Sequence, residues 1–378
     1  MRITRVDAVP VAVPLAEEFH WAGGAQVGAN LVLFAVHTED GIVGWGESIC
    51  EVPLATAEFG RALARQVVGG RVDEVETILD EIWTLGRWKT TPQFTQFVLS
   101  GIESACWDAL GRTLGRPTHT LFGGGVREEL DFFGFPQGDD AASLAAGARR
   151  LADHEVIYLK IGRPRDDDDA IVAAVREAIG PEKRLRVDPN EAWDADTAIE
   201  RIERLAEHRL DWVEQPVPHW DVEGLARVRG AVEVRIAADQ AVYTTPQLER
   251  VLAADAADVV VQGPHDAGGL LPFRRQAALC EARGVDVNLH GFVQSEISFL
   301  AHAHVAATIP NLTSGNQVMH QLLAERLTTG VDVATPAGRY RLPGAPGHGF
   351  EIDDDAVGRA NERFLRDGAY VNLEVGGR

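Results

Sequence analysis

Several features are scarce in this chain of 378 residues, and each scarcity excludes a class of protein. The longest apolar stretches have the length of a strand, so no segment could span a bilayer and no membrane partner is expected. The N-terminus, MRITRVDAVPVAVPL, alternates without the apolar core of a signal peptide, so we expect a cytoplasmic protein. The three cysteines, Cys50, Cys106 and Cys280, lie far apart without metal-ligand spacing, which predicts reduced thiols.

Positive charge is also scarce. Lys and Arg number 36 against 57 Asp and Glu, and the formal net charge is −21. A nucleic-acid partner would require a basic face, so this balance argues against one. An anionic substrate would in turn need a local cation, for which a bound metal ion is the obvious candidate.

The composition is otherwise that of a soluble globular protein, and the length suits two domains or one barrel with an added piece. Residues 1–50 alternate as in an antiparallel meander, with a loop expected from Leu15 to Ala29. Helical spacing follows over residues 56–121. The glycines at 123–125 break this pattern, so we predict a first domain over residues 1–124.

After this boundary the chain changes to a regular alternation of one short apolar run and one helical pattern. The runs end 28, 26, 25, 24 and 27 residues apart, which predicts βα units closed into a parallel barrel over residues 125–335. Residues 336–378 are expected to fold back onto the first domain. The runs end at Lys160, Asp188, Glu214, Asp239, about Gly263, and His290.

Three consecutive runs end in a carboxylate, at Asp188, Glu214 and Asp239. The carboxyl ends of barrel strands converge on the functional face, where three acids would repel one another unless a cation bound them. Oxygen ligands from separate rigid strands suit Mg²⁺. The competing interpretation is that each acid caps the following helix, but three in succession favour a metal site.

Two nitrogen-bearing side chains end strands on opposite walls of the expected barrel. Lys160, beside a divalent cation, would have a lowered pKa and could act as a base; a solvated surface lysine is the alternative. His290 is a candidate acid or base, with a hydrogen-bonded wall histidine as the alternative. His265 is a weaker candidate, and the pair His20-Trp21 could line a substrate lid or simply pack in a loop.

These residues resemble the enolase superfamily, in its mandelate racemase and muconate lactonizing branch. Val-Asp188-Pro-Asn190, Val-Glu214-Gln-Pro216 and Ala-Asp239 are similar to the magnesium ligands on the third, fourth and fifth strands of that family. The segment from Ser100 to Gly111 and the pair Gly268-Gly269 are also similar to family motifs. The resemblance implies an α+β capping domain, completed by the C-terminal tail, over a (β/α)7β barrel that binds Mg²⁺.

The departures from the family pattern concern the reaction. The lysine pair of the second strand is Tyr158-Leu159-Lys160, which keeps only the usual base, and the sixth-strand lysine or aspartate position aligns with Gly263. His290 is similar to the histidine of the racemase branch, but by this alignment it lacks an aspartate partner. The expected substrate-binding residues are Tyr158, Asn190, His20, Trp21, Gln240, which follows the fifth-strand ligand, His265, and Asn316, which aligns with an eighth-strand glutamate.

The resemblance implies removal of the proton alpha to a carboxylate, with Mg²⁺ stabilising the ene-diolate. Lys160 would take the proton, and His290 would protonate a leaving hydroxyl or return a proton to carbon. Without an aspartate partner His290 would be a weaker base, which favours dehydration of an α-hydroxy acid or sugar acid over racemisation or epimerisation. A carboxylate-binding barrel without turnover is the non-enzymatic alternative. The expected partners are a small carboxylate and further copies of the chain in a homo-oligomer.

Overall fold

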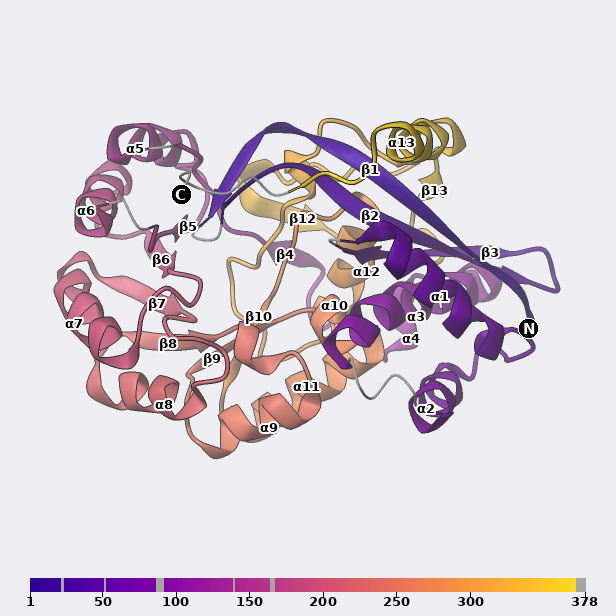
Figure 1. Cartoon of the computed structure of the whole chain (residues 1–378), viewed down its shortest axis with the longest axis horizontal. Coiled ribbons are helices and arrows are strands. Elements are labelled where there is room, and N and C mark those ends of the chain that lie inside the picture. The colour runs from indigo at the N-terminus through magenta and orange to yellow at the C-terminus, as the bar shows by residue number, and fades with distance from the viewer. Residues whose placement is uncertain (22–23, 51, 86–91, 139, 164–166, 372–378) are drawn as a thin grey trace.

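The computed structural model describes residues 1–21, 24–50, 52–85, 92–138, 140–163 and 167–371. A sheet-and-helix region formed by the first third of the chain lies beside a ring of strands and helices formed by the remainder (Figure 1). In the described part of the chain, no helix is both long enough and apolar enough to cross a membrane.

The N-terminal sheet consists of three antiparallel strands in the order β1-β2-β3. The loop expected from Leu15 to Ala29 is wrong, because this segment continues the β1–β2 hairpin as far as the pair Trp21–Gly24. Glu17 and Glu18 are exposed on this hairpin, while Phe19 beside them is buried. The strands are β1 (Ile3–Trp21), β2 (Gly24–Thr38) and β3 (Val43–Ile49).

Two of the four helices of this region, the first and the third, pack directly against the sheet, and the glycine-rich motif of β3 explains how closely the third one approaches. A Cβ on Gly46 would lie 2.1 Å from the carbonyl oxygen of Gly101, and one on Gly44 would lie 2.1 Å from that of Ala105. Only glycine therefore allows this helix–strand contact. The helices are α1 (Pro53–Val67), α2 (Val75–Leu85), α3 (Pro92–Leu114) and α4 (Thr118–Leu121).

The barrel has six consecutive parallel strands in the order β10-β9-β8-β7-β6-β5, each followed by a helix on the outside. The strands are β5 (Val156–Lys160), β6 (Arg184–Asp188), β7 (Leu210–Glu214), β8 (Arg235–Ala238), β9 (Val259–Gln262) and β10 (Asp286–Leu289). The helices around them are α5 (Ala141–Arg150), α6 (Asp168–Ile179), α7 (Ala195–Leu205), α8 (Val222–Ala231), α9 (Thr245–Ala253), α10 (Pro264–Ala267), α11 (Leu270–Ala282) and α12 (Glu296–Ala306).

Isolated bridges close the ring between β10 and β5. Val287 pairs with Leu312, Asn316 with Phe132, and Gly134 with Ile157. The segments around residues 132–135 and 312–317 are thus the first and eighth barrel strands, which completes the predicted (β/α)7β order. The buried guanidinium of Arg186 reinforces this seam from inside by donating to the carbonyl oxygens of Ser314 and Gly315.

The C-terminal segment returns to the N-terminal sheet, as the sequence predicted. Helix α13 (Asp354–Asp367) packs on β1, where Asn361 Nδ2 donates to the carbonyl oxygen of Pro10 at 2.7 Å. Tyr370 then exchanges two backbone hydrogen bonds with the side chain of Asn30, both 2.8 Å long. Short strands join the rest of the segment to the barrel: β4 (Glu129–Asp131) pairs with β12 (Arg339–Arg341), and β11 (Thr328–Thr329) with β13 (Glu351–Ile352).

Two buried carboxylates of the N-terminal region hold it against the barrel. Glu47 on β3 accepts hydrogen bonds from the backbone nitrogen and the hydroxyl of Ser295, the residue that caps α12. Glu103 on α3 accepts from the backbone nitrogens of Leu270 and Leu271 at the start of α11, at 2.8 and 3.0 Å. Each carboxylate thereby occupies a helix N-terminus, where free N–H groups favour negative charge.

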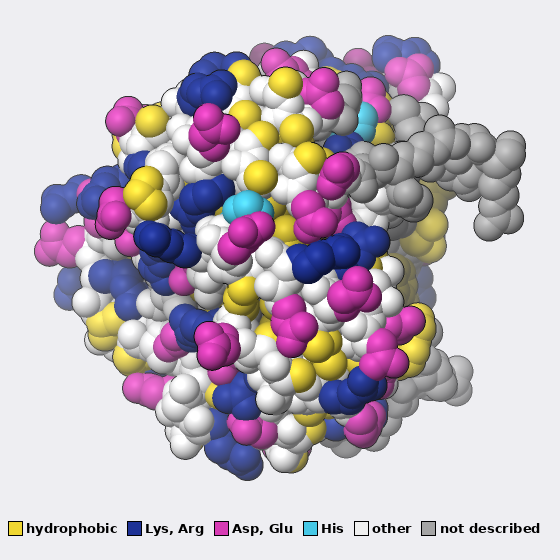
Figure 2. Space-filling model, turned by 90° about the vertical axis from the view of Figure 1, so that its left-hand side faces the viewer, with side chains coloured by type: hydrophobic (Ala, Val, Ile, Leu, Met, Phe, Trp, Pro, Cys, Tyr) yellow, Lys and Arg dark blue, Asp and Glu magenta, His cyan; other side chains and the backbone are white. Residues whose placement is uncertain are grey.

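The surface outside the barrel helices carries charge of both signs. Figure 2 shows the face formed by the left side of Figure 1, where Lys and Arg side chains are interspersed with Asp and Glu. The basic residues of this face do not form a continuous stripe.

Candidate active site

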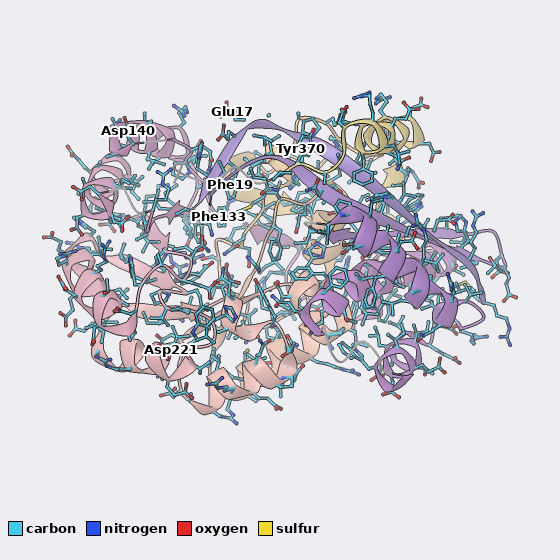
Figure 3. The ribbon with its side chains drawn as sticks, viewed as in Figure 1. Glu17, Phe19, Phe133, Asp140, Asp221 and Tyr370 are labelled. Atoms are coloured by element: carbon cyan, nitrogen blue, oxygen red, sulfur yellow. The ribbon has the colours of Figure 1, made fainter. Side chains whose placement is uncertain are left out.

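The three strand-end acids meet inside the barrel. Asp188 and Glu214 are fully buried and Asp239 is 1% exposed. The alternative role of helix cap is excluded, because the residues that cap α7, α8 and α9 through their side chains are Asp194, Asp221 and Thr244. Asp221 lies well away from the barrel axis in Figure 3.

The electrostatics of these acids show mutual repulsion. Burial, together with the charges of Asp188 and Asp239, raises the pKa of Glu214 to about 8. Burial also raises the pKa of Asp239 to about 7, with the neighbouring acids adding to the effect and His290 opposing it. Both carboxylate oxygens of Asp239 are buried without a hydrogen-bond partner. Such oxygens are costly unless a cation or donor binds them.

This donor set fits a magnesium ion in its chemistry. The ligands would be carboxylate oxygens held by three adjacent strands, and Asp239 has both oxygens available. Among the residues that the structure describes, however, no group of three or more acids, histidines or cysteines is already arranged around a common point. The ammonium group of Lys160 instead neutralises Asp188 directly. One oxygen of Asp188, Oδ2, is thus engaged by Lys160 in this structure.

Lys160 and Tyr158 lie on one side of the acids. The Tyr158 hydroxyl bridges Asp188 Oδ2 and Glu214 Oε1, at 2.7 and 2.8 Å, and Lys160 Nζ lies 3.2 Å from the same hydroxyl. Burial would lower the pKa of Lys160, but the three carboxylates, Asp188 first, outweigh it and raise the pKa. The lowered pKa expected for Lys160 beside a divalent cation stays a prediction, because bound Mg²⁺ would offset the charges of these carboxylates.

His290 has an aspartate partner, so the expectation that it lacks one is wrong. Its Nδ1 lies 2.9 Å from Asp266 Oδ2, and the same oxygen accepts a hydrogen bond from Gly263 N. The family pattern places this acid at Gly263. In the structure a single turn of helix, α10, follows Gly263 and brings the side chain of Asp266 back to that place. Burial would lower the pKa of His290, but Asp239 and Asp266 outweigh it and raise the pKa to about 9.

A cavity of about 230 Å³ lies beside the acids, and several of the residues expected at the site line it. Lys160, Asn190, Asp239, Gln240 and His290 all contribute to its wall. Asn190 also supports the acids, because its Nδ2 donates to Asp188 Oδ2 at 2.9 Å. Its volume lies below the range of roughly 300–1,000 Å³ that is typical of ligand pockets, so this cavity alone holds only a small group.

Of the two neighbouring amides Asn316 and Gln317, it is Gln317 that lines this cavity. Gln317 lines the cavity, and its Nε2 donates to both oxygens of Glu214, at 3.1 and 3.2 Å. Asn316, the expected residue, uses its amide to join strands: Oδ1 accepts from Leu289 N, and Nδ2 donates to the carbonyl oxygens of Asp131 and Thr313. Successive strand residues face opposite ways, so Gln317 faces this cavity and its neighbour Asn316 does not.

The other expected substrate-binding residues lie outside this cavity. His265 is buried behind His290, with its ring packed on Phe97, Phe292 and His302. His20 contributes to a small separate recess beside Lys160. The side chain of Trp21 is outside the described part of the chain. Phe19, its neighbour on the hairpin, is the residue that reaches the cavity.

Aromatic rings connect the hairpin with the acids. Phe19 lies 5.5 Å from Phe135, which lies 5.8 Å from Phe133, measured between ring centroids. Phe133 stacks on Tyr158 at 4.8 Å with nearly parallel planes. Figure 3 shows Phe19 and Phe133 near each other where the hairpin passes over the barrel. The hairpin therefore contributes directly to the enclosure of the cavity.

Comparison with known proteins places this architecture in a family. Residues 3–123 match the mandelate racemase / muconate lactonizing enzyme N-terminal domain, and residues 140–356 match the enolase C-terminal domain-like family. Muconate cycloisomerase 1 of Rhodococcus opacus is 28% identical, over 94% of this chain and 98% of its own length. A probable glucarate dehydratase of Streptomyces coelicolor is also 28% identical, over 97% and 93%.

A solved relative extends the similarity to the three-dimensional structure. The dipeptide epimerase of Enterococcus faecalis, complexed with Mg and the dipeptide L-Leu-L-Tyr, has a TM-score of 0.86 and 26% identity, covering 93% of this chain and 100% of its own. These relatives carry three different kinds of reaction on one architecture. The chain therefore belongs to the enolase superfamily, in its mandelate racemase and muconate lactonizing enzyme branch.

Proposed function

We propose that this protein removes the proton alpha to a carboxylate with the help of Mg²⁺ held by Asp188, Glu214 and Asp239. The observation that carries the proposal is the placement of Lys160 and His290. They end the second and seventh barrel strands, line one cavity, and have the three acids between them. This is the arrangement needed to move a proton at a carbon held above the acids.

Each residue has a definite part in this chemistry. Bound Mg²⁺ supplies positive charge that offsets the negative charge developing on the substrate carboxylate. Lys160, once released from Asp188, accepts the alpha proton on one face. Gln317 and Tyr158 hold Glu214 and Asp188 in place through their hydrogen bonds. His290, oriented by Asp266, delivers or accepts a proton on the opposite face.

The partner of His290 changes which overall reaction is favoured. The sequence favours dehydration because its family alignment gives His290 no aspartate partner and therefore makes it a weak base. Asp266 removes that argument, since it orients the imidazole and stabilises its charged form. Two comparably supported groups on opposite faces suit racemisation or epimerisation, which we place first. Dehydration is the second candidate, because the same His290 could protonate a leaving hydroxyl.

The test is alpha-proton exchange in D2O, followed by NMR on each enantiomer of a panel of acids. For a racemase or epimerase, Lys160→Ala and His290→Asn should each leave one enantiomer exchanging and the other nearly inert. For a dehydratase, His290→Asn should slow loss of water while exchange on the Lys160 face persists. Exchange by the double variant at the wild-type rate would exclude both residues from proton transfer.

A further inference from the structure

A second cavity of about 410 Å³ opens from the first one and is not used by the proposed proton transfer. The two cavities share the side chains of Gln26, Tyr243, Phe292 and Val293, which we call the neck. The outer cavity extends from the neck to β3, the start of α1 and the start of α3. It therefore lies between the N-terminal domain and the barrel, in direct continuation of the site.

The walls of the outer cavity are mainly apolar. Ile49, Val52, Phe94 and Phe97 face it from the N-terminal domain. Phe97 lies 5.6 Å from Phe292 and 6.1 Å from Tyr243, in edge-to-face contacts that form an aromatic wall beside the neck. Such edge-to-face surfaces favour flat or branched apolar groups over hydrated ones.

Few polar side chains are among the described residues of this cavity, and two of them are bonded within the protein. The Asn30 amide is occupied at both atoms by the backbone of Tyr370, at 2.8 Å each. Gln26 Nε2 donates to the carbonyl oxygen of Gly28 at 2.9 Å, and Gln93 lies exposed at the rim. A ligand with many hydroxyl groups would therefore meet few hydrogen-bonding groups to replace the water that it loses.

The two cavities differ in the charged side chains that line them. Lys160, Asp239 and His290 line the inner one, whereas no Lys, Arg, Asp or Glu is among the described residues that line the outer one. An anionic or cationic group placed beyond the neck would have no described counter-charge at the wall. A second carboxylate on the substrate would therefore be bound less well than a neutral group of equal size.

We propose that the substrate is a carboxylic acid whose reacting end occupies the inner cavity and whose other end is an uncharged apolar group in the outer cavity. The inference rests on the proposed function for the orientation of the carboxylate, but the apolar preference stands on the outer cavity alone. Acids with hydrophobic side chains fit this description. Sugar acids, with hydroxyl groups along the chain, and dicarboxylates do not.

Binding and exchange should be measured separately with a series of acids and Mg²⁺. The probes are N-acetyl-L-phenylalanine, N-acetyl-L-alanine, N-acetyl-L-glutamate and D-gluconate. Calorimetry with Lys160→Ala gives affinities without turnover, and the NMR assay with wild type gives exchange. N-acetyl-L-phenylalanine should bind roughly ten- to a hundredfold more tightly than N-acetyl-L-alanine, as expected for burying a ring. N-acetyl-L-glutamate and D-gluconate should gain nothing over N-acetyl-L-alanine.

A variant at the cavity rim tests the location. Val52 lines the outer cavity, is 54% exposed and precedes α1, where an acidic residue suits a helix N-terminus. Val52→Asp should lower the phenylalanine-over-alanine preference about threefold or more. The matched control is Val126→Asp, at a position 60% exposed and not among the described lining of either cavity, and it should leave the preference unchanged.

The possible failures are distinguishable. Selective binding of N-acetyl-L-phenylalanine without exchange of any acid would support the apolar cavity and contradict the proposed function. Exchange with preference for D-gluconate or N-acetyl-L-glutamate would support proton transfer and overturn the inference. Absence of binding by all four acids, or an equal loss of preference in both Val variants, would also overturn it.

Discussion

Buried carboxylates occur in two regions of this molecule, and similar burial serves different purposes in them. Glu214 and Asp239 in the barrel have pKa values raised by burial to about 8 and 7. Glu47 and Glu103 in the N-terminal domain are also buried, and burial raises the pKa of each to about 7. The carboxylates differ in what their oxygens contact.

The two carboxylates of the N-terminal domain have hydrogen-bond donors for their charge. Glu47 and Glu103 accept hydrogen bonds from the first residues of α12 and α11. In the barrel, by contrast, the acids lie close together, and Asp239 has two buried oxygens without a hydrogen-bond partner. Burial and a raised pKa alone therefore do not distinguish the two groups of acids; their contacts do.

The largest effect is expected from removing an acid of the barrel group. Asp188→Asn, or treatment with EDTA, should abolish exchange and turnover, because one ligand of the proposed metal site, or the ion itself, is lost. Calorimetric Mg²⁺ titration and the D2O assay measure this. The control is Asp286→Asn, whose carboxylate pairs with Arg235 at the other end of the barrel, 2.6 Å away. Full activity after exhaustive chelation would contradict the metal site.

Asp266→Asn should have the next largest effect. The amide can still accept from Gly263 N, so the turn at α10 is kept, but it cannot stabilise a charged imidazole at His290. Proton transfer on the His290 face should slow by about 10²–10⁴-fold, while exchange on the Lys160 face persists. Equal slowing on both faces would indicate a structural defect instead of a specific loss at His290.

Glu47 predicts a pH dependence of stability for the satisfied pair. Its folded pKa of about 7 lies above 4.5, the ordinary value of a glutamate, so the folded protein binds more protons than the unfolded chain between these values. Stability should therefore fall as pH rises from about 4.5 to 7, by on the order of 3 kcal/mol for this residue. Urea unfolding of Glu47→Gln should show a shallower fall. Glu39→Gln, at an exposed position, is the control.

The smallest effect is expected at Tyr158. Tyr158→Phe keeps the stacking on Phe133 but removes the hydroxyl that bridges Asp188 and Glu214. The free energy of unfolding without metal should fall by about 1–2 kcal/mol, because buried charged acceptors lose a donor. Tyr340→Phe is a matched control, since the buried Tyr340 hydroxyl has no hydrogen-bond partner. If both variants lose the same stability, the bridge contributes nothing.

The barrel and the positions of its acids could be predicted from the sequence because strand ends repeat at a regular interval. Lys160, Asp188 and Glu214 are the last residues of their strands, and Asp239 and His290 directly follow theirs. A side chain at such a position must face the same end of the barrel, whatever the loops do. The confirmed fold and the positions of these residues follow from that geometry; their catalytic and metal-binding roles are still predictions.

Contacts made by irregular segments could not be predicted in the same way. Asp266 reaches His290 only because α10 turns the chain back after β9. The outer cavity depends on how β3 and α3 sit against the barrel, and no periodic pattern encodes that distance. A signal for Asp266 did exist, since it is the acid nearest to the expected position at Gly263, but one sequence could not show the displacement.

The seam of the barrel, between β10 and β5, affects how the two proton-transfer groups can move relative to each other. Lys160 and His290 belong to the two edge strands of the six-stranded sheet, and the path between them through the first and eighth strands is joined by isolated bridges and by Arg186. The part of the barrel with the fewest backbone ties thus separates the two proton-transfer groups. Native-state hydrogen exchange should begin there, and breathing of the seam would let the gap between the groups adjust to acids of different width.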